Sequence, residues 1–444
     1  MRRLLEKAHA RLGDFWWYSL MLFCACRLAD VLNAFVGLWL VPKYVGPSEL
    51  GAVMPLSTFA GFLAIPIGVF ANTFRNELST LAINRKFGQM KSLMRGVFVA
   101  SVLFLVLAIV ICRFALPSFL SRIRVNEGSL GVLILLASFI GAIAPIYSNA
   151  LQALKKFKAN SLINFICAPV RLVTMLVAMP YRAISGYFVG QASTPAASMI
   201  ISVIGLRKEL SVPAEPYWNT NVLRRFSGLF LAFGVMAVAS GVGALVESTV
   251  LRQRLPELDS AAYYMVTRFS EIATYLSSVF CFTIFPFTAE NAARGKDPRP
   301  LIIKTSLAVL ATNALLAASY GLFGTAILSL LPNGSEYSAY SWAMPWTVGI
   351  VSISCINNLY TTGEVSASRF GFLKWSAPID ILYAIALLLV TGHGYFSGLI
   401  PKSASEFLTS HNITTLSTML WWMTAPNLLR LVFIARDLAR RKPS

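Results

Sequence analysis

Charged side chains interrupt the most apolar segments of this sequence. In the stretch CRLAD, Arg27 and Asp30 fall near the middle of residues 16–41, which are otherwise mostly apolar. A charge in the middle of a bilayer costs at least about 2.5 kcal/mol on insertion scales. Their spacing of three places Arg27, Asp30 and Asn33 on one helix face. Two interpretations remain open: the pair fixes helix packing, or the guanidinium lines a cavity and binds an anionic group.

Two further arginines are candidates for the same chemistry. Arg171, in the stretch APVRLV, has no acidic residue within one helical turn, so its partner comes from another segment or from a ligand. Arg268 and Glu271 repeat the spacing of CRLAD in the second half of the chain, with an interfacial salt bridge as the alternative role. Arginine suits bidentate contacts with phosphate. The three arginines therefore predict a site for an anionic, phosphate-containing group.

Acidic residues accompany these arginines. Asp30 and Glu271 are expected to offset part of the neighbouring positive charge. Glu247 and Asp380 are candidates for carrying a coupling proton or cation, with a helix-packing contact as the alternative. Arg430, at the cytoplasmic end of the last apolar segment, is expected to extend to the lipid headgroups.

The apolar segments that must position these side chains are long enough to cross a bilayer, which takes about 20 residues. We expect twelve membrane-spanning helices at residues 16–41, 51–73, 96–118, 129–150, 160–180, 184–206, 226–250, 262–287, 305–330, 338–361, 375–395 and 414–435. The expected fold class is therefore all-α, in a polytopic membrane protein.

Composition and charge agree with this class. The 444 residues are 56% hydrophobic and 13% charged, whereas ordinary soluble domains carry about 25% charged residues. Of the 38 lysines and arginines, 26 lie in the tails and even-numbered loops and 8 in the odd-numbered loops. By the positive-inside rule, both termini are cytoplasmic. The net charge of +19 thus reflects topology, and nucleic acid is not expected as a partner.

Cofactor chemistry and catalysis are not expected. The six cysteines fall within the predicted spans without metal-site spacing, and the histidines, His9, His393 and His411, lie on both sides of the membrane. The sequence has no phosphate loop of the GxxxxGK[ST] type, so ATP hydrolysis is not expected. The run at 16–41 is too long for the apolar core of a signal peptide. The outer loops are too short to build an enzyme site.

Similar turns recur in the two halves of the sequence. YVGPSELGAV (44–53) leads into the second predicted span, and RLPELDSAAYY (254–264) leads into the eighth. Similar segments with the same orientation imply parallel repeats. We therefore expect two six-helix lobes, residues 1–210 and 211–444, with a cavity between them near the midplane.

Three stretches resemble a known family. LVPKYVGPSELGAV (40–53), SNALQALKKFKANSLINFICAPVRLVTMLV (148–177) and SLLPNGSEYSAY (329–340) are similar to passages of the polysaccharide transporters. These are the lipid-linked O-antigen flippases of the multidrug/oligosaccharidyl-lipid/polysaccharide (MOP) exporter superfamily. The resemblance covers most of the first nine spans and thins out in the last three. It implies a twelve-helix, two-lobed, V-shaped, MATE-like transporter in the bacterial cytoplasmic (inner) membrane.

The resemblance also implies a function. Such flippases turn a polyisoprenyl-pyrophosphate-linked oligosaccharide over to the outer leaflet by alternating access. In this interpretation Arg27, with Arg171 and Arg268, binds the pyrophosphate, and H+ or Na+ drives the cycle. The alternatives are a drug/cation antiporter of the same superfamily, a peptidoglycan lipid-precursor flippase, and a membrane-embedded glycan polymerase or ligase. The expected partners are membrane lipids, glycosyltransferases and a polysaccharide polymerase, and the expected state is a monomer.

Overall fold

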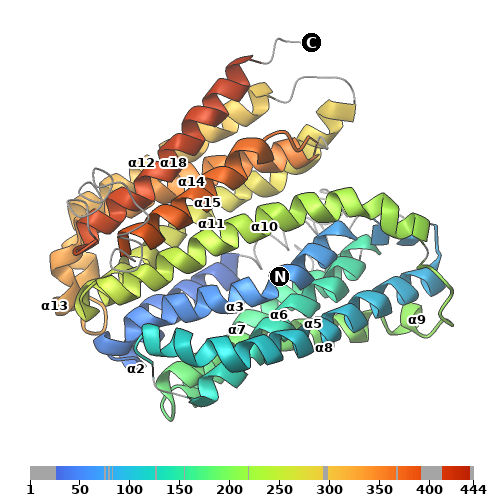
Figure 1. Ribbon diagram of the computed structural model, residues 1–444, viewed down its shortest axis with the longest axis horizontal. Helices are drawn as coiled ribbons and strands as arrows, with labels where there is room; N and C mark the ends of the chain where they lie inside the picture. The colour runs from blue at the N-terminus through green and yellow to red at the C-terminus, as the bar shows by residue number, and fades with distance from the viewer. Residues whose placement is uncertain are drawn as a thin grey trace, which may run out of the picture. The chain divides into compact units, whose positions relative to one another are not determined.

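The computed structural model describes most of the chain as helix (Figure 1). The described residues are 27–74, 77–78, 81–82, 84–125, 128–154, 156–218, 220–293, 299–366, 369–391 and 413–440. These ranges contain helices and turns and no strand, and the predicted all-α class is confirmed. The expectations for residues 1–26 and for the three histidines lie outside the described residues.

The helices follow one another with mostly short connections. Residues 27–35 are helical and continue into η1 and α2. The bounds are η1 Val36–Leu40, α2 Val41–Tyr44, α3 Pro47–Thr73, α5 Phe87–Arg122, α6 Gly128–Ala153, α7 Phe157–Ala178, α8 Ala183–Gly205, α9 Arg207–Leu210, α10 Thr220–Arg254, α11 Glu257–Ala293, α12 Arg299–Ser329, α13 Gly334–Tyr337, η2 Ser338–Tyr340, α14 Ala343–Ser366, α15 Leu373–Thr391 and α18 Leu416–Arg440.

Many of these helices can cross a membrane. Within the described part of the chain, eight are long and apolar enough to do so. A ninth is counted if Gly334–Tyr340 and Ala343–Glu364, which are bent by 68°, form one span. The helices α11 and α18 overlap in sequence with the predicted spans at 262–287 and 414–435. Charged and polar residues interrupt the apolar sequence of both helices. The chain is a multi-pass membrane protein, and the number of twelve spans stays a prediction.

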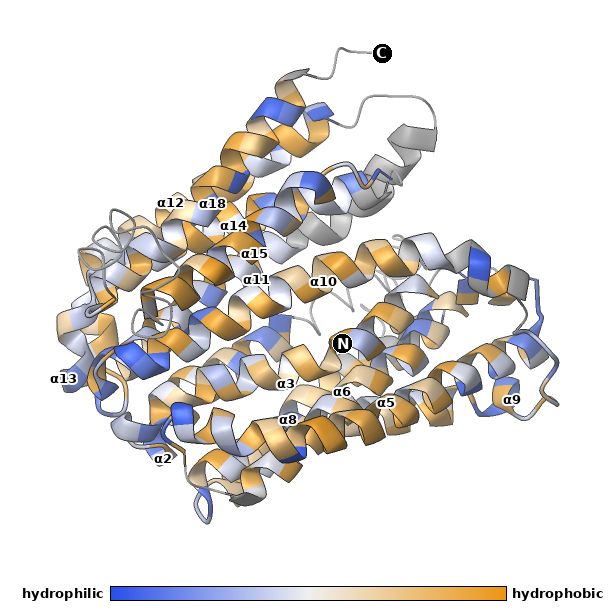
Figure 2. Cartoon of the chain, in the orientation of Figure 1, coloured by the Kyte–Doolittle hydropathy of each residue, from blue (hydrophilic) through white to orange (hydrophobic). Residues whose placement is uncertain are grey.

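The outer surface of the helices is apolar. In α5, Leu103 and Phe114 are 67% and 78% exposed, and Leu322 of α12 is 79% exposed. Figure 2 shows long hydrophobic stretches on α5 and α8. Soluble monomers rarely expose large contiguous apolar patches, so this surface is suited to lipid.

The helices pack into two compact units. The first consists of Met1–Val36, Phe59–Ser121 and Asn126–Ala237, and the second of Gly37–Thr58, Arg122–Val125 and Val238–Ser444. Boundaries fall inside the helices α3, α5 and α10, so each of these helices contributes residues to both units.

Each unit has its own core. In the first unit, α8 packs against α6 and α7 (Figure 1), and Met90 and Leu93 of α5 share a buried cluster with Leu151 of α6. In the second unit, α14 packs against α11, α12 and α18. Small residues let helices approach closely there, as they do in other membrane proteins: a Cβ added to Gly51 of α3 would lie 2.2 Å from Oγ of Ser260 in α11.

Candidate functional site

The opening helix carries the ion pair that its sequence spacing predicts. Nη1 of Arg27 lies 3.1 Å from Oδ2 of Asp30, and the two side chains are 26% and 24% exposed. The three-residue spacing places both groups on one face, as expected. Neither side chain is fully buried, so both charged groups keep some contact with the surroundings.

Arg171 reaches the same face of the opening helix from α7. Its Nη1 donates a hydrogen bond of 2.7 Å to Oδ1 of Asn33, one turn beyond Asp30. Its Nε is buried and has no hydrogen-bond acceptor in the described part of the chain. The sequence predicts that the partner of Arg171 comes from another segment or from a ligand, and the structure supplies a neutral amide.

These four residues, Arg27, Asp30, Asn33 and Arg171, form what we call the arginine cluster, and all belong to the first unit. The cluster contains two arginines and one aspartate, so with Asp30 ionised these four residues carry one net positive charge. A buried N–H without an acceptor costs about 1–3 kcal/mol. A phosphate oxygen would satisfy the free Nε of Arg171 and offset the remaining charge.

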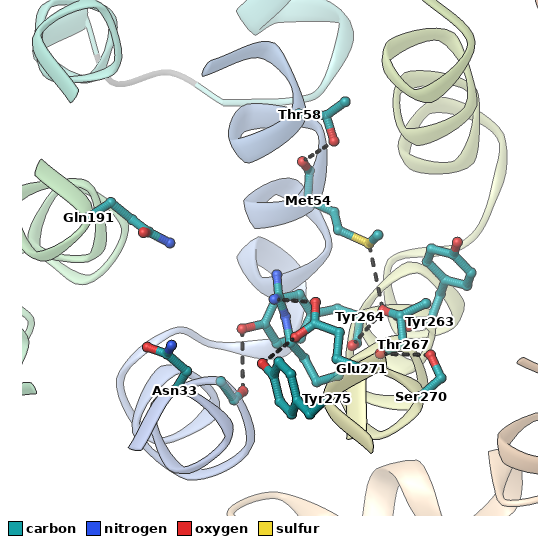
Figure 3. Close-up of polar contacts among 12 residues, drawn as sticks. Asn33, Met54, Thr58, Gln191, Tyr263, Tyr264, Thr267, Ser270, Glu271 and Tyr275 are labelled. Atoms are coloured by element: carbon teal, nitrogen blue, oxygen red, sulfur yellow. Dashed lines mark hydrogen bonds and ion pairs between the residues drawn. The ribbon is translucent and has the colours of Figure 1, made fainter. Parts of the chain in front are cut away.

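Arg268 lies in the second unit and is largely neutralised there. Its Nη1 is 2.6 Å from Oε1 of Glu271, and the hydroxyl of Tyr275 donates to the other carboxylate oxygen over 3.4 Å. The guanidinium carbon is 4.8 Å from the ring centroid of Tyr264. Figure 3 shows Tyr264, Glu271 and Tyr275 gathered along α11. The arginine is therefore held by an acid and an aromatic ring of its own helix.

A π-helical turn contacts this arginine. The five residues Val36–Leu40 form η1, and the carbonyl of Gly37 within it accepts a hydrogen bond of 3.3 Å from the Tyr264 hydroxyl. A Cβ on Gly37 would lie 3.1 Å from Cδ of Arg268, so the aliphatic stem of Arg268 passes over this glycine. π-helical turns are rare and occur frequently at functional sites.

The two predicted coupling acids lie in a second polar group, again within the second unit. Oε2 of Glu247 in α10 accepts a hydrogen bond of 2.9 Å from the Tyr383 hydroxyl in α15. Asp380 forms an ion pair with Arg430 of α18, and Nη1 of Arg430 donates 3.1 Å to Oδ1 of Asn427. Glu247 is close enough to Arg430 and Asp380 for their charges to interact.

We call these five residues, Glu247, Asp380, Tyr383, Asn427 and Arg430, the acidic cluster. Two carboxylates face one guanidinium, which leaves one net negative charge when both are ionised. Arg430 is 16% exposed and bonded to Asp380, instead of extending to lipid headgroups as expected from its position. The packing of α18 against α15 brings it inside.

One buried arginine has a structural role that the sequence analysis missed. Arg252, near the end of α10, is 1% exposed. Its Nη2 donates 2.6 Å to the carbonyl of Ser48, and its Nε donates 3.2 Å to the carbonyl of Ile123. It therefore ties two turns to α10. Its place in the basic run RQR at a span end gives no signal of this burial.

Comparison with known proteins identifies the fold. No protein-family model matches the sequence, and no curated protein matches it. Solved structures match over nearly the whole chain. One is an outward-facing multidrug resistance MATE transporter of the MOP superfamily, with 12% identity over 96% of this chain and 94% of that chain and a TM-score of 0.59.

Two other structures extend the comparison. The lipid II flippase MurJ in an inward closed conformation has 12% identity over 95% of this chain and 99% of that chain, with a TM-score of 0.57. A MOP superfamily transporter from Pyrococcus furiosus has 11% identity over 96% of this chain and 94% of that chain, with a TM-score of 0.58. At such identities the likeness shows the fold alone. The chain has the fold of the MATE and MurJ transporters of the MOP superfamily.

Proposed function

We propose that this protein is a flippase that moves a polyisoprenyl-pyrophosphate-linked oligosaccharide, such as an O-antigen repeat unit, across the cytoplasmic membrane. The observation that carries the proposal is the net positive charge of the arginine cluster. Buried charges in a membrane protein are costly and usually functional. A pyrophosphate supplies the acceptor oxygens and the negative charge that this cluster lacks.

The proposed binding step uses the contacts of the arginine cluster. The pyrophosphate accepts hydrogen bonds from the free Nε of Arg171 and from Arg27, while Asn33 keeps the Arg171 side chain in place. Asp30 limits the affinity of the arginine cluster for pyrophosphate, because it already neutralises part of the charge on Arg27. Arg268 assists in a second step, for which Glu271 must release it.

The proposed translocation step is alternating access between the predicted lobes at residues 1–210 and 211–444. The oligosaccharide crosses within the protein, and the isoprenoid tail stays in lipid. Glu247 and Asp380 carry the coupling proton or cation, since they give the acidic cluster its net negative charge.

A second candidate function is a drug/cation antiporter. The acidic cluster favours it, because a net negative charge attracts cations. The likeness to a multidrug resistance MATE transporter is compatible with either function. In the Pyrococcus furiosus transporter, the reverse polarity of the binding pocket suggests a different function. Pocket charge is therefore the property that separates the two candidates.

Depletion of the protein from cells that produce it tests the proposal. Lipids are extracted and the polyisoprenyl-linked species are identified by mass spectrometry. Accumulation of a pyrophosphate-linked surface oligosaccharide, reversed by the wild-type protein but not by Arg27→Ala, supports the flippase. Accumulation of a peptidoglycan precursor would instead indicate a lipid II flippase. Unchanged glycolipids together with increased sensitivity to cationic dyes would replace the proposal with the antiporter.

A further inference from the structure

A hollow of about 690 Å³ opens on the surface of the first unit, between α6, α7 and α8. Its walls are aliphatic and include Val132 of α6, Val177 of α7 and Val189 of α8. Val132 and Val177 are 61% and 63% exposed. These valines offer no polar partner to an ordered water, which needs about two to four, and the polar residues of the lining are Tyr181, Arg182 and Ser185. The hollow is therefore suited to a hydrocarbon chain.

Close helix packing shapes this hollow. Along α8, a Cβ added to Gly186 would lie 2.6 Å from the backbone nitrogen of Met179, and one added to Gly190 would lie 2.2 Å from Cγ of Met175. The two glycines let α8 lie directly against the end of α7. Since α8 also packs against α6, the walls are fixed by the packing of three helices.

A cation stands at one end of the hollow. Arg182 lines it from the turn between α7 and α8, and its exposed side chain has no hydrogen bond or ion pair with any described residue. Its neighbour Tyr181, also in the lining, is 86% exposed. Tyrosine is enriched at membrane–water interfaces, and arginine there can reach the headgroups. The hollow thus has apolar walls along the helices, and the positive charge of Arg182 lies at one end of it, between the predicted spans at 160–180 and 184–206.

We propose that this hollow binds one anionic phospholipid of the surrounding bilayer, with an acyl chain along Val132, Val177 and Val189 and the phosphate on Arg182. Charge complementarity selects this occupant, because the one cation of the lining has no protein partner among the described residues. An acyl chain fits the aliphatic walls, and both parts belong to the same molecule. The lipid is bound by the first unit and is not the cargo of the proposed transport.

Native mass spectrometry of the full-length protein tests this site. The protein is taken from vesicles that contain phosphatidylcholine and phosphatidylglycerol in equal amounts, and the retained lipid is counted and identified. We expect one phosphatidylglycerol on the wild type. Arg182→Gln should lower its retention at least about tenfold, the effect of losing one charge-assisted hydrogen bond. Val189→Trp should lower it similarly by filling the hollow.

Two matched variants make the result specific. Arg122→Gln removes another exposed arginine outside the hollow and should keep the lipid, and Arg182→Lys should keep most of it. Gel filtration confirms that each variant is folded and monodisperse. Retention by Arg182→Gln equal to the wild type, or equal retention of phosphatidylcholine and phosphatidylglycerol by the wild type, would overturn the proposal. Because no cargo is present, the result is independent of the proposed function.

Discussion

The arginine cluster of the first unit and the acidic cluster of the second both combine arginine, aspartate and asparagine, but they carry opposite net charges when their acids are ionised. In the arginine cluster, Asp30 offsets Arg27, and Arg171 is left with the neutral amide of Asn33. In the acidic cluster, Arg430 offsets Asp380, and Glu247 is left with the hydroxyl of Tyr383. In both, one ion pair is complete, and the remaining charge has a neutral hydrogen-bond partner among the described residues.

This difference shows where a ligand of each sign is favoured. The uncompensated guanidinium of Arg171 favours an anion, and the uncompensated carboxylate of Glu247 favours a proton or another cation. The ion pair between Asp380 and Arg430 joins α15 to α18 and is suited to holding these two helices together. The following experiments separate the uncompensated charges from the paired ones.

Removing the uncompensated arginine should have the largest effect. Arg171→Ala takes away the guanidinium that a pyrophosphate would bind, so we expect glycolipid turnover to fall at least about tenfold in reconstituted vesicles. Arg171→Lys keeps the charge but not the bidentate geometry and should lie in between. Arg122→Gln is the control. Turnover by Arg171→Ala at the wild-type rate would remove the functional distinction between the two clusters.

Removing the uncompensated acid should lower gradient-driven transport and leave headgroup binding unchanged. Glu247→Gln still accepts a hydrogen bond from Tyr383 but carries no ionisable group. We expect transport driven by a pH or sodium gradient to fall about tenfold, the effect of losing one charged interaction, with headgroup binding unchanged. The exposed Glu336 offers the matched control Glu336→Gln. If Glu247→Gln abolished headgroup binding, the separate roles of the two clusters would be refuted.

A buried arginine outside both clusters should matter for stability only. Arg252→Met leaves the carbonyls of Ser48 and Ile123 without their donor, so we expect the free energy of unfolding to fall by about 3 kcal/mol. Thermal unfolding in detergent measures the loss. Arg254→Met, on the exposed side of the same helix, should change stability by less than about 0.5 kcal/mol. Equal stability of the two variants would contradict the assigned role.

The smallest effect is expected at the glycine beneath Arg268. Gly37→Ala places a Cβ 3.1 Å from Cδ of Arg268, so the arginine stem must shift by a few tenths of an ångström. We expect a loss of less than about 1 kcal/mol in the free energy of unfolding. Gly61→Ala in α3 meets no neighbouring atom and should be neutral or stabilising. Thermal unfolding in detergent compares the two variants, and a larger loss for Gly61→Ala would contradict the described packing.

The sequence predicts local features of this protein better than its long-range contacts. The three-residue spacing is enough to predict the pairs Arg27–Asp30 and Arg268–Glu271, because it defines one helix face. Apolar length likewise predicts the all-α membrane class. The partner of Arg171 could not be predicted, because it lies 138 residues away and depends on how α7 packs.

Two other features also depend on long-range contacts that the sequence does not predict. Position alone suggests that Arg430 reaches the headgroups, but Asp380 of α15 binds it instead. The predicted span at 338–361 contains no charged residue, and its composition does not encode the 68° bend before Ala343. Both depend on contacts between helices that are distant in sequence.

Binding of a polyisoprenyl pyrophosphate to the purified protein tests the central claim most directly. Its affinity is compared with that of the corresponding polyisoprenyl alcohol, for the wild type, the Arg27→Ala/Arg171→Ala double variant and the Arg122→Gln control. We predict that the wild type and the control prefer the pyrophosphate by at least about tenfold and that the double variant binds both lipids equally. Equal affinities in the wild type, or an unchanged preference in the double variant, would contradict the account.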